Sequence, residues 1–302
     1  MSKVITLREA ISTYVHDGDL VAIEGFTHLI SFAAGHEIIR QGRRDLALAR
    51  LAPDLVYEQL VAAGCARKLI FSWLGNPGVG PLHAIRRAIE HGELDIEEYS
   101  HFGMASRYFA GAARLPFYPL RSYEGSDLPS VNPQIRTVSS PFDDKEEIPV
   151  VPPLTPDVTI IHAHRADRDG NVQAWGIVGV QREAALAARQ VIAVVEQLVD
   201  SEVIRSDPNR TILPAMAVDA VCVEPMGAHP SYAQGIYDRD NGFYRAWGSI
   251  SRDPSRLDAW LDDWVYGLDS RAEYVARLAP ERIDALRMKP RPSGSVDYGR
   301  HG

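Results

Sequence analysis

Several features that mark particular protein classes are scarce in this chain. Its 302 residues include only two cysteines, Cys65 and Cys222, and no CxxC pair, so a structural zinc site is not expected. For so distant a pair, a reduced chain is favoured over a disulfide. The net charge of −8 argues against nucleic acid as a partner, because phosphate binding needs a basic face.

Long apolar segments are also missing. The first residues, MSKVITLREA, lack the apolar region of a signal peptide. No apolar run reaches the ~18 residues that a transmembrane helix needs. Composition is otherwise ordinary, with 45% apolar and 24% charged residues, which excludes a disordered or fibrous chain. These features predict a cytoplasmic protein with no membrane segment.

The short motifs of common nucleotide and hydrolase sites are absent. There is no Gly-Lys dipeptide, which excludes a Walker A loop, and no GxSxG. Gly75, Gly78 and Gly80 are spaced GxxGxG, which is not a dinucleotide fingerprint.

A metal site is not predicted either. His162 and His164 would share a face of a strand, but no third ligand has metal spacing. A calcium loop starting at Asp167 would place Val172 and Val178 where Gly and Glu are needed. A strand end followed by a turn is the favoured interpretation.

The pattern that is present alternates apolar runs with helical periodicity. Thr6 and Glu9 have capping-box spacing at the start of a first helix. Such alternation is typical of an α/β fold, a mainly parallel sheet flanked by helices. Expected strands cover 20–23, 46–51, 68–72, 117–120, 158–162, 191–195 and 218–223, and expected helices cover 31–41, 54–63, 82–90, 102–113 and 182–188.

One domain is expected over residues 1–280, followed by a polar tail at 281–302. Residues 122–156 are rich in proline and predict a loop-rich excursion from that domain. A helical region over 257–278 carries Trp260, Trp264, Tyr266 and Tyr274. These aromatic residues favour a surface for a partner, with intramolecular core as the alternative.

Candidate site residues follow the ends of expected strands. Gly25, Phe26, Thr27 and His28 come directly after the strand at 20–23. The carboxyl end of a parallel strand is where ligands bind, and a glycine there lets a ligand approach the backbone. The alternative is a tight turn with a structural glycine.

Other candidates occupy later loops. Asn76, Gly78 and Val79 lie after the strand at 68–72, and His229 precedes a proline, which forces it extended. Glu24 and Glu124 are carboxylates of the kind that act as nucleophiles, although such residues are more often solvated or paired.

The blocks EGFTHL, GNPGVG, ARLPFYPLRSYEGSDL, PDVTIIHAHRADRDGNVQAWG and VDAVCVEPMGAHPSYAQGIYDRDNGFY, in this order, resemble the A (α) chains of glutaconate-type family I CoA-transferases. The resemblance covers residues 2 to 280. Within that family, RLAPDLVYEQLVAAGCARKLIFSW and QREAALAA are similar to the A chains of 3-oxoadipate CoA-transferases.

The resemblance implies the CoA-transferase fold and a partner chain, the B subunit, usually in an A2B2 assembly. It implies ping-pong transfer of CoA from succinyl-CoA to a dicarboxylate such as 3-oxoadipate, with acyl-CoA as substrate and no tightly bound cofactor. The nucleophilic glutamate would lie on the B subunit in a Glu-Asn-Gly motif. This chain has no Glu-Asn-Gly, so neither Glu24 nor Glu124 is expected to be the nucleophile, and no catalytic residue is expected in this chain.

By the same resemblance, backbone N–H groups of residues 25–28 and 76–80 would line the acyl pocket, with Thr27 or His28 at the distal carboxylate. Three alternatives stay open: the A chain of a glutaconate CoA-transferase, one chain of a hydrolase that opens a steroid-derived ring as a CoA thioester, and a non-enzymatic CoA-binding protein. The hydrolase is disfavoured because such relatives carry an acidic residue where this chain has His101.

Overall fold

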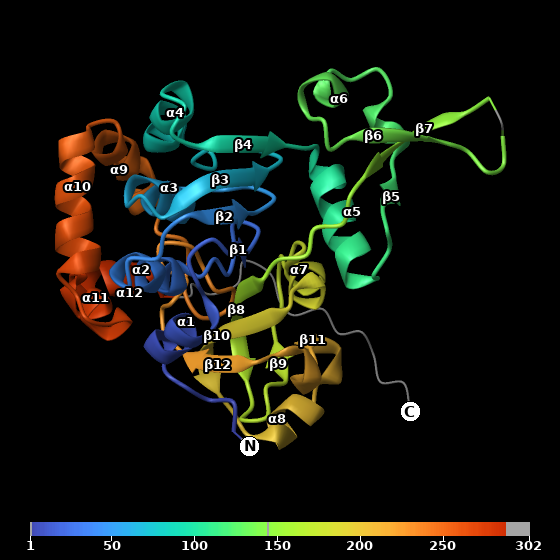
Figure 1. Ribbon diagram of the computed structural model, residues 1–302. Helices are drawn as coiled ribbons and strands as arrows, with labels where there is room; N and C mark the ends of the chain where they lie inside the picture. Colours follow the sequence, from blue (N-terminus) through green and yellow to red (C-terminus); the bar gives the residue numbers. More distant parts are fainter. Residues whose placement is uncertain (1, 144, 288–302) are drawn as a thin grey trace.

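The structure, a computed structural model, describes residues 2–143 and 145–287. These residues fold around a nine-stranded β-sheet (Figure 1). The sheet runs β12–β10–β8–β1–β2–β3–β4, and all neighbours in this series are parallel. β9 and β11 extend it antiparallel from β8. The strands are β1 Leu20–Glu24, β2 Leu46–Ala49, β3 Ala66–Phe71, β4 Asp95–Glu98, β8 Val158–Ala166, β9 Val172–Gln173, β10 Gln190–Leu198, β11 Thr211–Leu213 and β12 Ala220–Val223.

Helices cover both faces of this sheet, which confirms the expected α/β class. Because successive side chains of a strand point to opposite faces, Val21 and Ile23 pack with α1 to α4, α9 and α10. Ala22, between them, faces the opposite layer, which includes α5 and α7. None of the helices within the described residues is long and apolar enough to cross a membrane. The main helices are α1 Leu7–Tyr14, α2 Phe32–Arg40, α3 Leu55–Ala62, α4 His83–Glu90, α5 His101–Ala112, α7 Gln181–Ala187, α8 Ser201–Arg205, α9 Asn241–Ser251, α10 Pro254–Leu261, α11 Arg271–Arg277 and α12 Pro280–Leu286.

The predicted capping box at the start of α1 is confirmed. The Thr6 hydroxyl accepts a hydrogen bond from the Glu9 N–H (3.2 Å), and a Glu9 carboxylate oxygen accepts one from the Thr6 N–H (2.9 Å). Each group satisfies a donor that the first helical turn leaves unpaired.

The loop-rich excursion contains a small sheet of its own. β5 (Tyr118–Pro119), β7 (Glu147–Val151) and β6 (Arg136–Ser139) pair antiparallel, with α6 (Leu128–Val131) between them in sequence. This sheet projects from the main body beyond α5 (Figure 1). The chain then returns to the core at Leu154, whose N–H donates to the Arg107 carbonyl of α5 (3.0 Å).

The aromatic region over 257–278 is not one helix. α10 ends in a π-helical turn at Asp262–Tyr266, and α11 begins after Ser270, whose hydroxyl caps it. Trp260 and Tyr274 are buried, and Trp260 packs against Trp247 of α9. The prediction that these aromatic residues form a partner surface is therefore wrong for these two side chains, which belong to the core.

The ordered domain also extends beyond residue 280. α12 covers Pro280–Leu286. Leu286 is buried in the same apolar cluster as Tyr237 and side chains of β8 and β10. The domain boundary therefore lies past residue 286, and the rest of the predicted tail lies outside the described residues.

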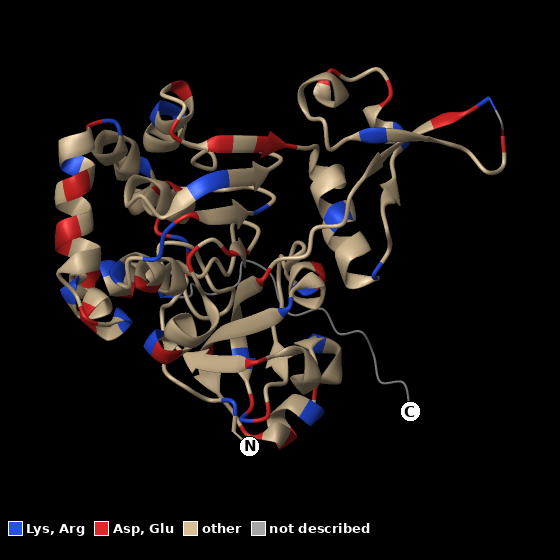
Figure 2. Cartoon of the chain, in the orientation of Figure 1, with Lys and Arg blue, Asp and Glu red and all other residues tan. Residues whose placement is uncertain are grey.

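Charged side chains line the free edge of the sheet. β4 carries Asp95, Glu97 and Glu98 and forms the acidic outer strand in Figure 2. Lys68 of β3 pairs with Glu97. Charge on an edge strand opposes pairing with another chain.

Candidate active site

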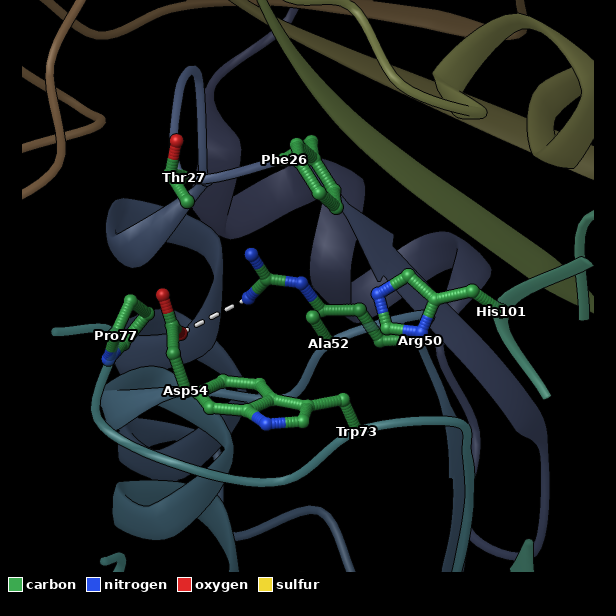
Figure 3. A pocket seen from close by; sticks show the side chains of 8 residues that line it. All are labelled: Phe26, Thr27, Arg50, Ala52, Asp54, Trp73, Pro77 and His101. Atoms are coloured by element: carbon green, nitrogen blue, oxygen red, sulfur yellow. Dashed lines mark hydrogen bonds and ion pairs between the residues drawn. The ribbon is translucent and has the colours of Figure 1, made fainter. Parts of the chain in front are cut away.

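A cavity of about 260 Å³ lies where β1 to β4 end (Figure 3). These strands are parallel, so their carboxyl ends meet at one edge of the sheet, where ligands bind in such folds. Each of the four following loops supplies at least one lining residue. The lining residues are Phe26 and Thr27 after β1, Arg50, Ala52 and Asp54 after β2, Trp73 and Pro77 after β3, and His101 after β4.

Gly25 is required by close backbone contact. A Cβ atom on Gly25 would lie 2.6 Å from the Leu29 carbonyl oxygen and 2.8 Å from that of His28. The residues with left-handed backbone are instead Thr27 (φ 57°) and Leu29 (φ 52°). Non-glycine residues adopt this conformation only when their surroundings impose it, and such strain is concentrated at functional sites.

Hydrogen bonds from distant segments hold this strained turn. The Ser231 hydroxyl donates to the Thr27 carbonyl (2.9 Å), and the Leu29 N–H donates to the Tyr232 carbonyl (2.9 Å). The Gln181 amide donates to the carbonyls of Glu24 and Leu29 (3.3 Å each). The turn is therefore fixed by the fold.

His28 takes part in the same support. Its side chain is fully buried, its Nδ1 lies 3.0 Å from the Ile177 carbonyl, and its Nε2 accepts a hydrogen bond from the Gln234 N–H (3.0 Å). Nδ1 therefore carries the proton of a neutral ring. Burial lowers the pKa of His28 to about 4. Both ring nitrogens are engaged within the chain, so the structure does not direct His28 toward the cavity.

Arg50 and Asp54 form a buried ion pair at the cavity. Arg50 Nη1 donates to Asp54 Oδ1 (2.9 Å), Arg50 Nη2 donates to the Gly25 carbonyl (2.6 Å), and each side chain is 1% exposed. Arg50 Nε and Asp54 Oδ2 are buried and have no hydrogen-bond partner among the described residues. Burial raises the pKa of the Asp54 carboxyl although Arg50 opposes the shift.

Glu24 lies inside the protein, next to the turn. It is 2% exposed, and one of its carboxylate oxygens accepts a hydrogen bond from the Leu51 N–H (3.1 Å). Burial raises the pKa of Glu24 despite the nearby Arg50 guanidinium. Glu124 follows the short 3₁₀-helix Arg121–Tyr123 in the excursion and does not line the cavity.

The loop after β3 reaches the cavity through Pro77. Asn76 and Gly80 close the loop by two backbone hydrogen bonds, at 2.8 and 3.1 Å, and the Asn76 amide donates to the Tyr244 carbonyl (2.8 Å). Gly78, with φ 74°, and Val79, 44% exposed, lie at the tip. The predicted residues Asn76, Gly78 and Val79 thus border the cavity without lining it.

His229 lies elsewhere, in the protein core. Its Nδ1 is 3.0 Å from the Tyr274 hydroxyl and its Nε2 is 3.1 Å from Asp240 Oδ2. The side chain is fully buried, and burial lowers its pKa to about 4. The structure does not bring His229 to the cavity. His162 and His164 are likewise bonded within the chain, to Glu196 and to the Gln234 carbonyl.

Sequence reasoning missed four lining side chains with chemical function: Arg50, Asp54, Trp73 and His101. The strand-end rule that selected Gly25 applies equally to the expected strand at 46–51, so Asp54 had a usable signal. Arg50 falls within that expected strand, which in the structure ends earlier, at Ala49. His101 follows β4, a strand that the sequence pattern does not predict, so strand ends do not locate it. Its one signal was the resemblance, in which hydrolase relatives carry an acidic residue at this position.

Comparison with known proteins identifies the family. Residues 4–224 match the coenzyme A transferase family. The chain belongs to this family. It is 54% identical to the A chain of the 3-oxoadipate CoA-transferase of Pseudomonas knackmussii, over 92% of this chain and 99% of that protein. It is 35% identical to the A chain of the glutaconate CoA-transferase of Acidaminococcus fermentans, over 96% of each chain. The expectation of a CoA-transferase is confirmed.

Solved structures share this fold, and the similar proteins include enzymes that are not named as transferases. The crystal structure of the A. fermentans glutaconate CoA-transferase superimposes with a TM-score of 0.91 at 34% identity, covering 96% of both chains. The AibA/AibB decarboxylase superimposes with a TM-score of 0.75 at 31% identity, covering 87% of this chain and all of the other. The IpdA chain of the cholesterol ring-cleaving hydrolase of Rhodococcus jostii is 27% identical over 91% of this chain and 95% of its own length.

Proposed function

We propose that this chain is the A component of a heteromeric CoA-transferase that moves CoA from succinyl-CoA to 3-oxoadipate. The observation that carries the proposal is the 54% identity to the A chain of the P. knackmussii 3-oxoadipate CoA-transferase over nearly the whole length of both proteins. The enzyme would be an A2B2 assembly with a B subunit. Cys65 and Cys222, buried and free, are compatible with a reducing cytoplasm.

The nucleophile is assigned to the B subunit. A glutamate that attacks a thioester must reach the cavity in its ionised form. Asp54 is the only carboxylate among the described lining residues, and it is 1% exposed and ion-paired. Glu24 is buried, does not line the cavity, and holds the Leu51 N–H at 3.1 Å. The ping-pong route, through an anhydride and a glutamyl-CoA thioester, would therefore use a glutamate that the partner presents to this cavity.

This chain would bind the acyl group beside that glutamate. At about 260 Å³ the cavity is slightly smaller than the ~300–1,000 Å³ of typical ligand pockets, so it suits a short acyl chain rather than whole CoA. The fixed backbone of residues 25–28 would donate N–H groups to the thioester oxygen as negative charge develops there. The loop at residues 76–80 does not suit this role, because Pro77 has no N–H and those of Asn76, Val79 and Gly80 are bonded within the loop. Such donors are effective because they need no rearrangement during the reaction.

A glutaconate CoA-transferase is the second candidate. It is favoured by the TM-score of 0.91 with the A. fermentans enzyme. Both acceptors are dicarboxylates, so the two candidates require the same kind of cavity and differ in acyl chain length and oxidation.

The test is reconstitution with a B-type partner, sought first in the adjacent reading frame. We expect CoA transfer from succinyl-CoA to 3-oxoadipate by the mixture and none by either chain alone. Faster transfer from acetyl-CoA to glutaconate would favour the second candidate. Preference for acetate or butyrate would refute both, and release of free CoA without an acceptor would instead identify a hydrolase.

A further inference from the structure

His101 offers one ring nitrogen to the cavity. It is the first residue of α5, and its exposed side chain stands edge-on to Phe26, with ring centroids 6.3 Å apart. Its Nδ1 lies 2.8 Å from the Ser72 hydroxyl. Whichever of the two atoms carries the proton, this bond occupies Nδ1 and leaves Nε2 for a ligand. His101 and Arg50 both line the cavity drawn in Figure 3.

A carboxylate ligand would select the form of His101 that donates from Nε2. The Leu51 carbonyl, the other acceptor of the Ser72 hydroxyl, already accepts the N–H groups of Ser72 and Trp73 at 3.1 Å each. The Ser72 hydroxyl lies 2.7 Å from this carbonyl oxygen and 2.8 Å from His101 Nδ1, so its proton goes to one of these two atoms. A neutral ring that accepts at Nδ1 carries its proton on Nε2 and donates from there, as the charged ring also does.

The charge around the cavity suits an anion. Arg50 lies under the cavity with an unpaired Nε, and Asp54 is the one carboxylate paired with it among the described residues. A second guanidinium, Arg239, donates to the Pro77 carbonyl on the loop wall (2.8 Å). These two guanidinium groups lie near the Asp54 carboxylate and the buried Glu24 carboxyl, whose pKa is raised by burial. Phe26, Trp73 and Pro77 supply apolar wall beside these groups.

We propose that His101 binds the far carboxylate of the dicarboxylate acyl group through Nε2, with Arg50 supplying the buried positive charge beneath it. This inference rests on the proposed function. It makes His101 the residue by which the enzyme distinguishes a dicarboxylate from a monocarboxylate of the same length. Strong discrimination needs a hydrogen-bond donor that the monocarboxylate leaves unpaired, because adding or removing one apolar group of a substrate changes its kcat/KM only modestly.

The experiment compares two acceptors in the reconstituted complex. One is 3-oxoadipate, and the other is 3-oxohexanoate, which has a methyl group in place of the far carboxylate. The ratio of their kcat/KM values is measured for the wild type, His101→Phe and His101→Gln. A ratio within one sample does not depend on how much of that sample is folded. His91→Phe is the matched control, since His91 is an exposed histidine at the end of α4, away from the cavity.

We expect His101→Phe to lower the preference for 3-oxoadipate by about ten- to a hundred-fold, the effect of losing a hydrogen bond to a charged group. His101→Gln, which keeps an amide donor, is expected to lie between, and His91→Phe to match the wild type. If a variant turns over too slowly, the dissociation constants of adipate and hexanoate are measured by calorimetry, and their ratio replaces the ratio of kcat/KM values.

An unchanged ratio in His101→Phe would overturn the inference and leave the proposed function standing. Equal losses with both acceptors would also overturn it, because they would mean that the ring only supports the local structure. A wild-type complex that transfers CoA to neither acid would instead refute the proposed function.

Discussion

The contact between Gly25 and the turn that follows it leads to a sharp prediction for Gly25→Ala. The new methyl group would lie 2.6 Å from the Leu29 carbonyl oxygen, about 0.8 Å inside ordinary van der Waals contact. The neighbours are backbone atoms fixed by hydrogen bonds, so the turn must shift as a unit. Overpacking of this kind costs about 1–3 kcal/mol of the free energy of unfolding.

The same shift would displace the cavity wall. A displacement of about 1 Å in a positioning element reduces rate by as much as ~100-fold. We therefore expect Gly25→Ala to lower the kcat/KM of the reconstituted complex by one to two orders of magnitude while the two chains still associate. The assays are thermal melting of the chain, size-exclusion chromatography of the complex and transfer kinetics on the same preparations.

Gly248→Ala is the matched control. Gly248 lies in α9, and a Cβ atom there meets nothing within 4 Å. Alanine is the better helix former by up to ~1 kcal/mol, so this variant is expected to keep or raise the melting temperature and to keep full activity. If Gly25→Ala has the melting temperature and the kcat/KM of the wild type, the contact between residue 25 and the Leu29 carbonyl does not constrain the turn. If its rate falls only in proportion to the folded fraction, the turn is structural and does not line the acyl site.

Three further predictions concern buried charges. Glu24→Gln should keep activity within a few-fold in the complex, because the Glu24 carboxyl is buried and does not line the cavity; loss of activity to background would make Glu24 the nucleophile. Arg50→Met should lower the free energy of unfolding in urea by about 3–5 kcal/mol, since it leaves Asp54 buried and unpaired. The control Arg205→Ala breaks an exposed ion pair and should lower it by ~0–1 kcal/mol. Equal losses in the two variants would contradict this expectation. The pKa of His28 is about 4 in the folded chain and ordinary in the unfolded chain. The stability contributed by the neutral ring should therefore be full above about pH 6.5 and fall toward pH 4 by at most ~1.4 kcal/mol per pH unit. If the pH dependence of unfolding is unchanged in His28→Gln, His28 does not cause this fall.

The sheet was predictable wherever burial left a trace in the sequence. β1, β2 and β10 are buried almost throughout and appear as apolar runs. β4 was not predicted because Asp95, Glu97 and Glu98 do not form an apolar run. On an edge strand such charged residues oppose pairing with another chain. β9 and β11 contain two and three residues, too few to show a period.

The site was predictable in place and less so in its members. Strand ends located the cavity, because the topology of a parallel sheet brings those ends together whatever the sequence of the loops. The roles of individual side chains depend on contacts between distant segments. His28 and His229 both follow apolar strands and look equivalent in sequence, yet each is bonded at both ring nitrogens by residues that only the fold brings near. Arg50 and Asp54 look like surface charges, and only their burial reveals the ion pair.

The position of the strain connects the fold to the proposed chemistry. The sequence suggests that Gly25 is the residue with unusual backbone, but the left-handed residues are Thr27 and Leu29, and Gly25 only makes room for them. Each left-handed non-glycine residue costs on the order of 1–3 kcal/mol, which a turn does not sustain alone. The bonds from Gln181, Ser231 and Arg50 reach this turn from three other parts of the chain. A conformation held from so many sides keeps its N–H groups in place when charge develops on a substrate oxygen, which is the property that the proposed acyl site needs.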